Sequence, residues 1–197
     1  FFLTFEQLAD QVNVRIEAEP LPLPTPPDAN PVSPDIGVRT FEEIYATLSQ
    51  ITGVSMNNSN VRNVYLTVKQ QLPTKEDIES FLSSHQMGIT QMAIEYCSAL
   101  MDDTGLRGST FPSFDFSGSV SSSFDTSGRN ALIDPLLARV MGTDLTTQPA
   151  TADVKTELNN LIDRLTACAG SCEAGRTLKV AKATCAAAAG SAITLVQ

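Results

Sequence analysis

Four cysteines restrict the fold of this 197-residue chain more than any other feature of its sequence. Their number is even, so all four can be joined in disulfides, with three possible connectivities. Cys168 and Cys172 lie at a predicted helix end, where Gly170 can turn the chain sharply enough to bring their Cβ atoms within disulfide range. We therefore favour one bridge between Cys168 and Cys172 and a second between Cys97 and Cys185. The alternative interpretation is four reduced cysteines buried in the core.

A metal or haem site at the cysteines is the weaker interpretation. Zinc needs further ligands, but the chain has no C-x-x-C pair, and its one histidine, His85, is far in sequence from Cys168 and Cys172. Covalent haem needs C-x-x-C-H, which is absent, as are the glycine-rich nucleotide-binding motifs. We expect no metal and no cofactor. Disulfides require an oxidising compartment, which predicts an extracellular, periplasmic or cell-surface location.

The first 38 residues differ in pattern from the rest of the chain. Residues 12–19 alternate apolar and polar side chains with the period of a strand, so residues 1–19 are predicted to be a β-strand segment, an edge strand or the end of a preceding domain. Residues 20–38 carry seven prolines and are predicted to form an extended, semi-rigid linker. The chain opens on Phe1 without an initiating Met or a leader-peptide pattern, so we expect a mature product or a fragment.

Helical signals fill residues 39–197, which we predict to be a mainly α, disulfide-stapled bundle of about six helices. Thr40 and Glu43 form a capping box before the apolar stripe of a helix over 41–52, and Gly53 follows it. Apolar positions at helical spacing predict five more helices, over 57–72, 78–100, 134–142, 151–168 and 174–189. Pro135 is expected at the first position of its helix.

The segment 102–128 has no sustained helical period and is rich in Gly, Ser, Asp and Phe. A loop of about 25 residues is longer than is usual in a compact domain, so it should be packed or functional. Its four phenylalanines are expected to anchor it onto the helical core, and they are also our candidate interaction residues. These four are Phe111, Phe114, Phe116 and Phe124.

No arrangement of residues indicates catalysis. The acid–base candidates are Asp102, Asp103 and Asp115 in the aromatic segment, but their spacing is not specific, and aspartates beside turns are better explained as solvated or locally hydrogen-bonded. Ser55 lacks the surroundings of a nucleophile elbow, and nothing in the sequence pairs His85 with a nucleophile. We expect no catalytic residue and a protein that is not an enzyme.

Charge and hydropathy argue against nucleic acid and against a membrane span. The 13 basic and 22 acidic side chains give a net charge of -9, which repels phosphate backbones and anionic lipid surfaces. The longest weakly polar run, 183–196, is shorter than the roughly 20 residues that span a bilayer, so we expect a buried helix there. Its alanine-rich part, 186–192, allows close helix contacts. We favour core packing over self-assembly as the reason for these small residues.

Several stretches resemble a helical segment of large, mostly uncharacterised exported proteins of Gram-negative bacteria that also carry a laminin-G-like (concanavalin-like) sandwich domain. The similar stretches are PDIGVRTFEEI (34–44), ITGV (51–54), QLP (71–73), SHQM (84–87), IEYC (94–97) and the tail 176–197. Together they cover most of residues 34–197. The resemblance implies an extracytoplasmic address and a preceding sandwich that residues 1–19 would close, with carbohydrate as a partner of that adjoining domain. It implies no reaction and no site residues.

Three functions are compatible with these features. The leading hypothesis is a non-enzymatic structural or adhesive module of an exported cell-envelope protein, with protein partners or self-association. The first alternative is a self-assembling subunit of an extracellular filament or surface layer, in which residues 1–19 pair with a neighbouring sheet edge. The second alternative is a ligand-binding or enzymatic domain that uses the aromatic and acidic segment 102–128.

Overall fold

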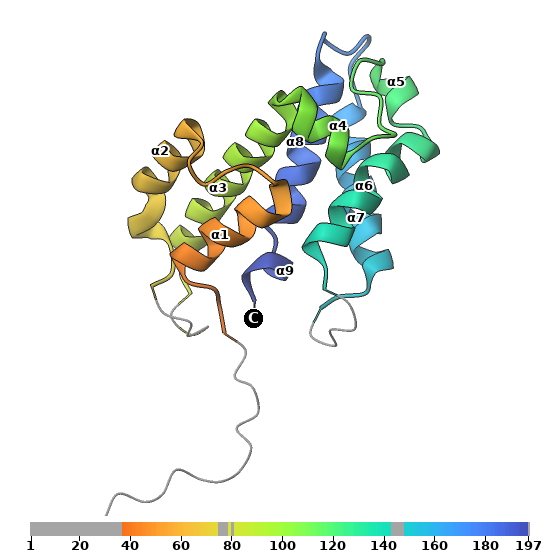
Figure 1. Ribbon diagram of the computed structural model, residues 1–197. Helices are drawn as coiled ribbons and strands as arrows, with labels where there is room; N and C mark the ends of the chain where they lie inside the picture. Colours follow the sequence, from red (N-terminus) through yellow and green to blue (C-terminus); the bar gives the residue numbers. More distant parts are fainter. Residues whose placement is uncertain (1–36, 75–78, 80, 143–147, 197) are drawn as a thin grey trace, which may run out of the picture. The chain divides into compact units, whose positions relative to one another are not determined.

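The computed structural model describes residues 37–74, 79, 81–142 and 148–196 (Figure 1). These residues belong to one compact unit that spans residues 36–197. The strand predicted over 1–19, and the predicted linker 20–38 apart from its last two residues, lie outside the described residues.

The described residues are mainly helical, which confirms the predicted fold class. They contain nine α-helices and one 3-10 helix, so the predicted count of about six is not confirmed. The elements are α1 (Phe41–Thr52), α2 (Ser59–Val68), η2 (Lys69–Gln71), α3 (Ser83–Asp102), α4 (Thr104–Thr110), α5 (Val120–Ser123), α6 (Thr126–Val140), α7 (Thr151–Thr166), α8 (Arg176–Ala189) and α9 (Ala192–Leu195). The short helices α4 and α5 lie in the segment that was predicted to be a loop.

Local capping fixes the starts of α1 and α2 close to where the sequence predicts them. The backbone N–H and the hydroxyl of Thr40 donate to Glu43 Oε2 at 2.7 and 2.9 Å, and α1 then runs as far as Thr52. The side chain of Asn58 accepts hydrogen bonds from the backbone of residues 60 and 61 at the start of α2. Both caps satisfy donors that the first helical turn leaves free, which is why helices begin there.

Two predicted helix starts differ from the structure. The helix predicted from residue 78 begins at Ser83, because Leu82 is extended with φ -111° and ψ 158°. The helix predicted from Pro135 begins nine residues earlier, at Thr126, where the carboxylate of Asp125 accepts from Gly128 N at 2.7 Å. Pro135 therefore lies inside α6 and not at its first position.

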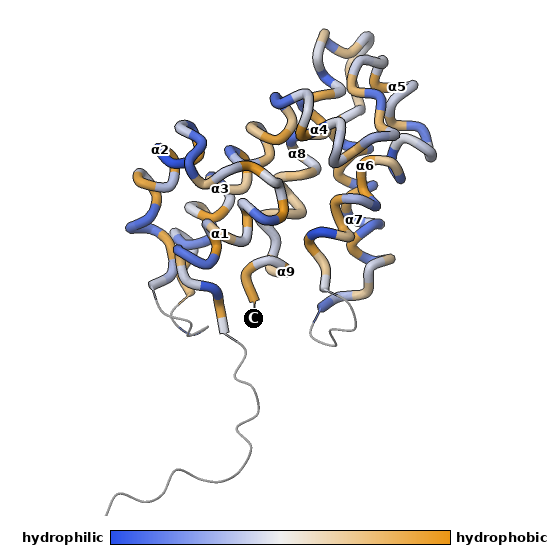
Figure 2. Tube along the Cα trace, in the orientation of Figure 1, coloured by the Kyte–Doolittle hydropathy of each residue, from blue (hydrophilic) through white to orange (hydrophobic). Residues whose placement is uncertain are grey.

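Helices α3 and α8 form the centre of the unit (Figure 1). Helices α1 and α2 pack against α3, whereas α6 and α7 pack against α8. Buried positions recur along both central helices, and Figure 2 shows apolar and polar residues alternating along the longer helices, as expected for helices with one buried face. None of the described helices is both long and apolar enough to cross a membrane.

Small side chains let the C-terminal end of α8 approach α3 closely. Ala188 and Ala189 are buried, and a Cβ atom on Gly190 would lie only 3.3 Å from the Cβ of Ala93. Gln86 of α3 also donates to the carbonyl of Gly190 at 3.1 Å. The alanine-rich stretch therefore packs in the core at these positions, which agrees with the interpretation made from the sequence.

Two disulfides reinforce this arrangement. One joins Cys97 of α3 to Cys185 of α8, with a Cα–Cα distance of 5.8 Å, and both residues are fully buried. The other joins Cys168 to Cys172 in the turn between α7 and α8, with a Cα–Cα distance of 5.4 Å. This is the pairing that the sequence favours among the three possible ones, and it cross-links the central helix pair directly.

Candidate functional site

The four phenylalanines of segment 102–128 form one aromatic cluster. Phe114 lies 4.7 Å from Phe116 and 5.3 Å from Phe124, measured between ring centroids, and Phe111 lies 6.1 Å from Phe116. Phe111, Phe114 and Phe124 are buried in the hydrophobic core. The rings anchor the segment as expected, because each buries a large apolar area and their edge-to-face contacts are favourable.

Phe116 is the most accessible ring of the cluster, and a cation covers it. The guanidinium carbon of Arg107 lies 5.1 Å from the centroid of the Phe116 ring. Arg107 also donates to the carbonyl of Met101 at 2.9 Å, which ties α4 to the end of α3. A partner that contacts this cluster from outside would therefore meet Phe116 and Arg107, while the other three rings serve as core.

The three candidate acids of this segment have separate structural partners. Asp102 accepts from Lys182 of α8 at 2.7 Å, and Asp103 caps α4 by accepting from the N–H groups of Gly105 and Leu106 at 2.9 Å. Asp115 accepts from the hydroxyl and the backbone N–H of Ser117 at 2.7 and 2.9 Å. Asp103 and Asp115 form the local hydrogen bonds expected from the sequence, whereas Asp102 forms an ion pair between α3 and α8 that the sequence did not predict.

These contacts also predict how stability changes with pH. Hydrogen bonds from Ser117 hold the pKa of Asp115 below its ordinary value of 3.8, and hydrogen bonds from Thr40 do the same for Glu43, whose ordinary value is 4.5. Because both pKa values are lower in the folded state, the stabilisation from these two groups is present above the ordinary pKa values and is lost as pH falls through the folded ones.

We expect the midpoint temperature of thermal unfolding to decrease when the pH is lowered below about 4.5. The Asp115→Asn variant should show a shallower decline, and an identical decline would contradict this role for Asp115.

A cleft with a volume of about 810 Å³ lies beside this cluster. One wall is the serine-rich stretch 117–121, and the other is the turn over residues 166–177 that contains the Cys168–Cys172 bridge. The hydroxyl of Thr177 donates to the carbonyl of Gly118 at 2.9 Å and links the two walls. Sequence analysis did not find this cleft, because its walls are about 50 residues apart and neither carries a recognisable motif.

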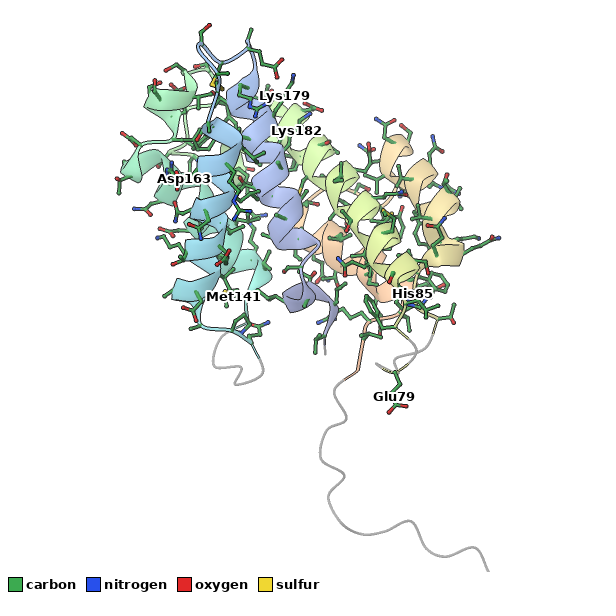
Figure 3. All side chains as sticks on the ribbon, turned by 180° about the vertical axis from the view of Figure 1, so that it is seen from behind. Glu79, His85, Met141, Asp163, Lys179 and Lys182 are labelled. Atoms are coloured by element: carbon green, nitrogen blue, oxygen red, sulfur yellow. A yellow bond between two sulfur atoms is a disulfide. The ribbon has the colours of Figure 1, made fainter. Side chains whose placement is uncertain are left out.

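Both arginines that line this cleft form hydrogen bonds with oxygen atoms of the chain itself. Arg129 donates to the carbonyl of Phe124 at 2.8 Å and to Asp163 of α7 at 2.6 Å. Arg176 donates twice to the carbonyl of Leu165, at 2.9 and 2.6 Å. Figure 3 shows Asp163 on α7, beside α8 with Lys179 and Lys182. The guanidinium groups hold α6, α7 and α8 together, so they are not free to bind an anionic ligand.

The remaining residues tested for chemistry also have local roles. The Nδ1 atom of His85 accepts from the backbone N–H of Leu82 at 3.1 Å, at the start of α3, and the ring lies 5.5 Å from that of Phe81 (Figure 3). The hydroxyl of Ser55 accepts from the backbone N–H of Asn57 at 3.2 Å in the turn before α2. Within the described ranges, no three His, Cys, Asp or Glu side chains are grouped so that they could hold a metal ion.

The described residues therefore form a helical scaffold that is cross-linked by two disulfides. The charged groups described above are used for capping, for ion pairs and for contacts between helices, and the aromatic segment is packed against the core. Comparison of the chain with protein-family models, with curated proteins and with solved structures finds no match.

Proposed function

We propose that this chain is a non-enzymatic structural or adhesive module of an exported protein that works in the cell envelope or outside the cell. The observation that carries the proposal is the fully buried bridge between Cys97 and Cys185. Structural disulfides of this kind persist in oxidising compartments such as the periplasm or the cell exterior. The second bridge, in the turn between α7 and α8, supports the same location.

Exposed apolar side chains support contact with another protein surface. On α3, Met87 and Ile94 are 58% and 49% exposed, and their spacing of seven residues places them on one face of the helix. Leu66 of α2 is 50% exposed. Exposed apolar side chains on one helix face can supply contact area to a partner protein. The partner is either another protein or a second copy of this chain, and light scattering separates the two, because a second copy raises the mass above 21.1 kDa.

The test of this proposal is the oxidation state of the cysteines in protein that is isolated natively and then denatured and alkylated without reductant. We expect mass spectrometry to find no alkylated cysteine, and proteolysis without reductant to yield linked peptides that contain Cys97 with Cys185. Alkylation after reduction should label all four cysteines and serves as the control. Four alkylated cysteines in the unreduced sample would overturn the proposal, because the chain would then be a reduced protein with a loosely linked core.

A further inference from the structure

A second cleft extends along α1, from Arg39 just before its capping box to Ile51 near its C-terminal end. It has a volume of about 650 Å³, within the range of small-molecule sites, and is formed by the C-terminal half of α1, the end of α6 and the short helix α9. Its apolar wall consists of Ile51, Val140, Pro149, Ile193 and Val196. Thr47, Gln50, Gln148 and Thr194 add polar groups to the lining. The cleft is separate from the aromatic segment and from the disulfides.

Two arginines give this cleft a positive charge within an acidic chain. Arg39 and Arg139 both line it, and none of the described residues in its lining is acidic, although the whole chain has a net charge of -9. Neither arginine forms an ion pair with any residue that the structure describes, in contrast to the occupied guanidinium groups of the first cleft. Arg139 donates one N–H to the carbonyl of Ile51 at 3.1 Å, and the Nε atom of Arg39 is buried without a hydrogen-bond partner among the described residues.

The fold holds Arg39 in place at the cleft. An antiparallel bridge pairs Val38 with Val196, and the backbone N–H of Arg39 donates to the carbonyl of Leu195 at 2.8 Å. The acid on the next helix turn, Glu43, accepts both of its hydrogen bonds from Thr40; its charge interacts with that of Arg39 through space, but the two groups form no hydrogen-bonded ion pair. A buried donor without a partner costs free energy, so a ligand that supplies an acceptor at Arg39 is favoured there.

We propose that this cleft binds a small aliphatic carboxylate, with its head group at Arg39 and Arg139 and its chain against the apolar wall. Guanidinium groups bind carboxylates through paired, charge-assisted hydrogen bonds. The apolar wall of the cleft suits a short hydrocarbon chain, and neither a fully polar anion nor an uncharged alkane would use both this wall and the arginines. This ligand site is independent of the module's structural role.

The proposal is tested with sodium octanoate and the full 197-residue chain carrying isotope-labelled methyl groups. We expect saturable NMR shifts at the methyl groups of Ile51, Val140 and Ile193, with a dissociation constant of about 1 mM for a ligand of this size. Acetate offers the charge alone and 1-octanol the chain alone, so each should bind at least about tenfold more weakly. The Arg39→Met and Arg139→Met variants should each weaken octanoate binding by about tenfold or more.

Three further variants separate binding from folding. Arg164→Met removes an exposed arginine of α7 that does not line the cleft, so it should leave octanoate binding unchanged. Ala192→Trp fills the cleft without changing charge and should abolish binding. Arg39→Lys keeps the charge and loses the planar fork, so its affinity should lie between those of the wild type and Arg39→Met. Thermal unfolding confirms that each variant is folded. Absence of methyl shifts in the wild type, or equal binding by octanol and octanoate, would overturn the proposal.

Discussion

We expect replacement of Cys97 and Cys185 together by alanine to be among the most destabilising changes that this chain can carry. The bridge joins positions separated by 88 residues, and the loop-entropy relation for a loop of that length gives a loss of about 4.6 kcal/mol in the free energy of unfolding. Both sulfur atoms are fully buried between α3 and α8, so the truncation also removes packing contacts from the centre of the core. Urea denaturation followed by circular dichroism measures the loss.

The second disulfide provides the matched control. Cys168 and Cys172 are only 4 residues apart, and the same relation gives a loss of about 2 kcal/mol for Cys168→Ala with Cys172→Ala. These two residues are partly exposed, so their truncation leaves no cavity in the core. The two double variants should therefore differ by more than twofold in destabilisation. Equal losses, or a larger loss from the short bridge, would contradict the view that the Cys97–Cys185 bridge staples the scaffold.

Features of this fold that depend on neighbours in sequence were predictable. The start of α1 follows from Thr40 and Glu43, which are three residues apart, and the short disulfide follows from two cysteines on either side of a turn. The pairing of Cys97 with Cys185 then follows by elimination. In the first two cases the energetic cause lies within a few residues, so the local pattern is sufficient to predict the structure.

The start of α6 was not predictable in the same way, because two stretches compete for it. Asp134 followed by Pro135 has the pattern of a helix start, but Asp125 caps the helix nine residues earlier. The carboxylate of Asp134 instead pairs with Lys155 of α7 at 2.7 Å. A proline inside a helix removes one backbone hydrogen bond, and burial of four leucine and isoleucine side chains on either side of it offsets that loss. These four are Leu132, Ile133, Leu136 and Leu137.

The two clefts show what a pattern within one stretch of sequence cannot contain. The anchoring role of the phenylalanines was predictable from their number in one segment, since large rings are rarely left in water. The arginine-lined cleft depends on Arg39 and Arg139, which lie 100 positions apart. Arg139 reaches it because α6 packs against α1, where Arg139 donates to the carbonyl of Ile51, and the bridge between Val38 and Val196 holds Arg39 there. No spacing rule connects such positions, and neither arginine belongs to a motif.

Replacement of Gly128 by alanine should destabilise the chain, although alanine is the better helix former. Gly128 is in the first turn of α6, and a Cβ atom there would meet the backbone carbonyl of Ser123, with the carbonyl carbon at 2.8 Å. That contact is with main chain and not with a flexible side chain, so α5 or α6 must shift. The shift would disturb the cap at Asp125 and the buried ring of Phe124. We expect a loss of about 1–3 kcal/mol, the range for overpacked sites.

Gly108→Ala is the control that isolates the steric cause. Gly108 is also helical, in α4, and a Cβ atom there would meet nothing within 4 Å. Alanine stabilises an exposed helical position by up to about 1 kcal/mol relative to glycine, so this variant should be neutral or more stable than the wild type. Helix propensity acts in the same direction at both sites, and therefore opposite signs for the two variants can come only from the close approach of α6 to Ser123. If Gly128→Ala instead stabilises the chain as Gly108→Ala does, the tight turn between α5 and α6 is not a constraint on the fold.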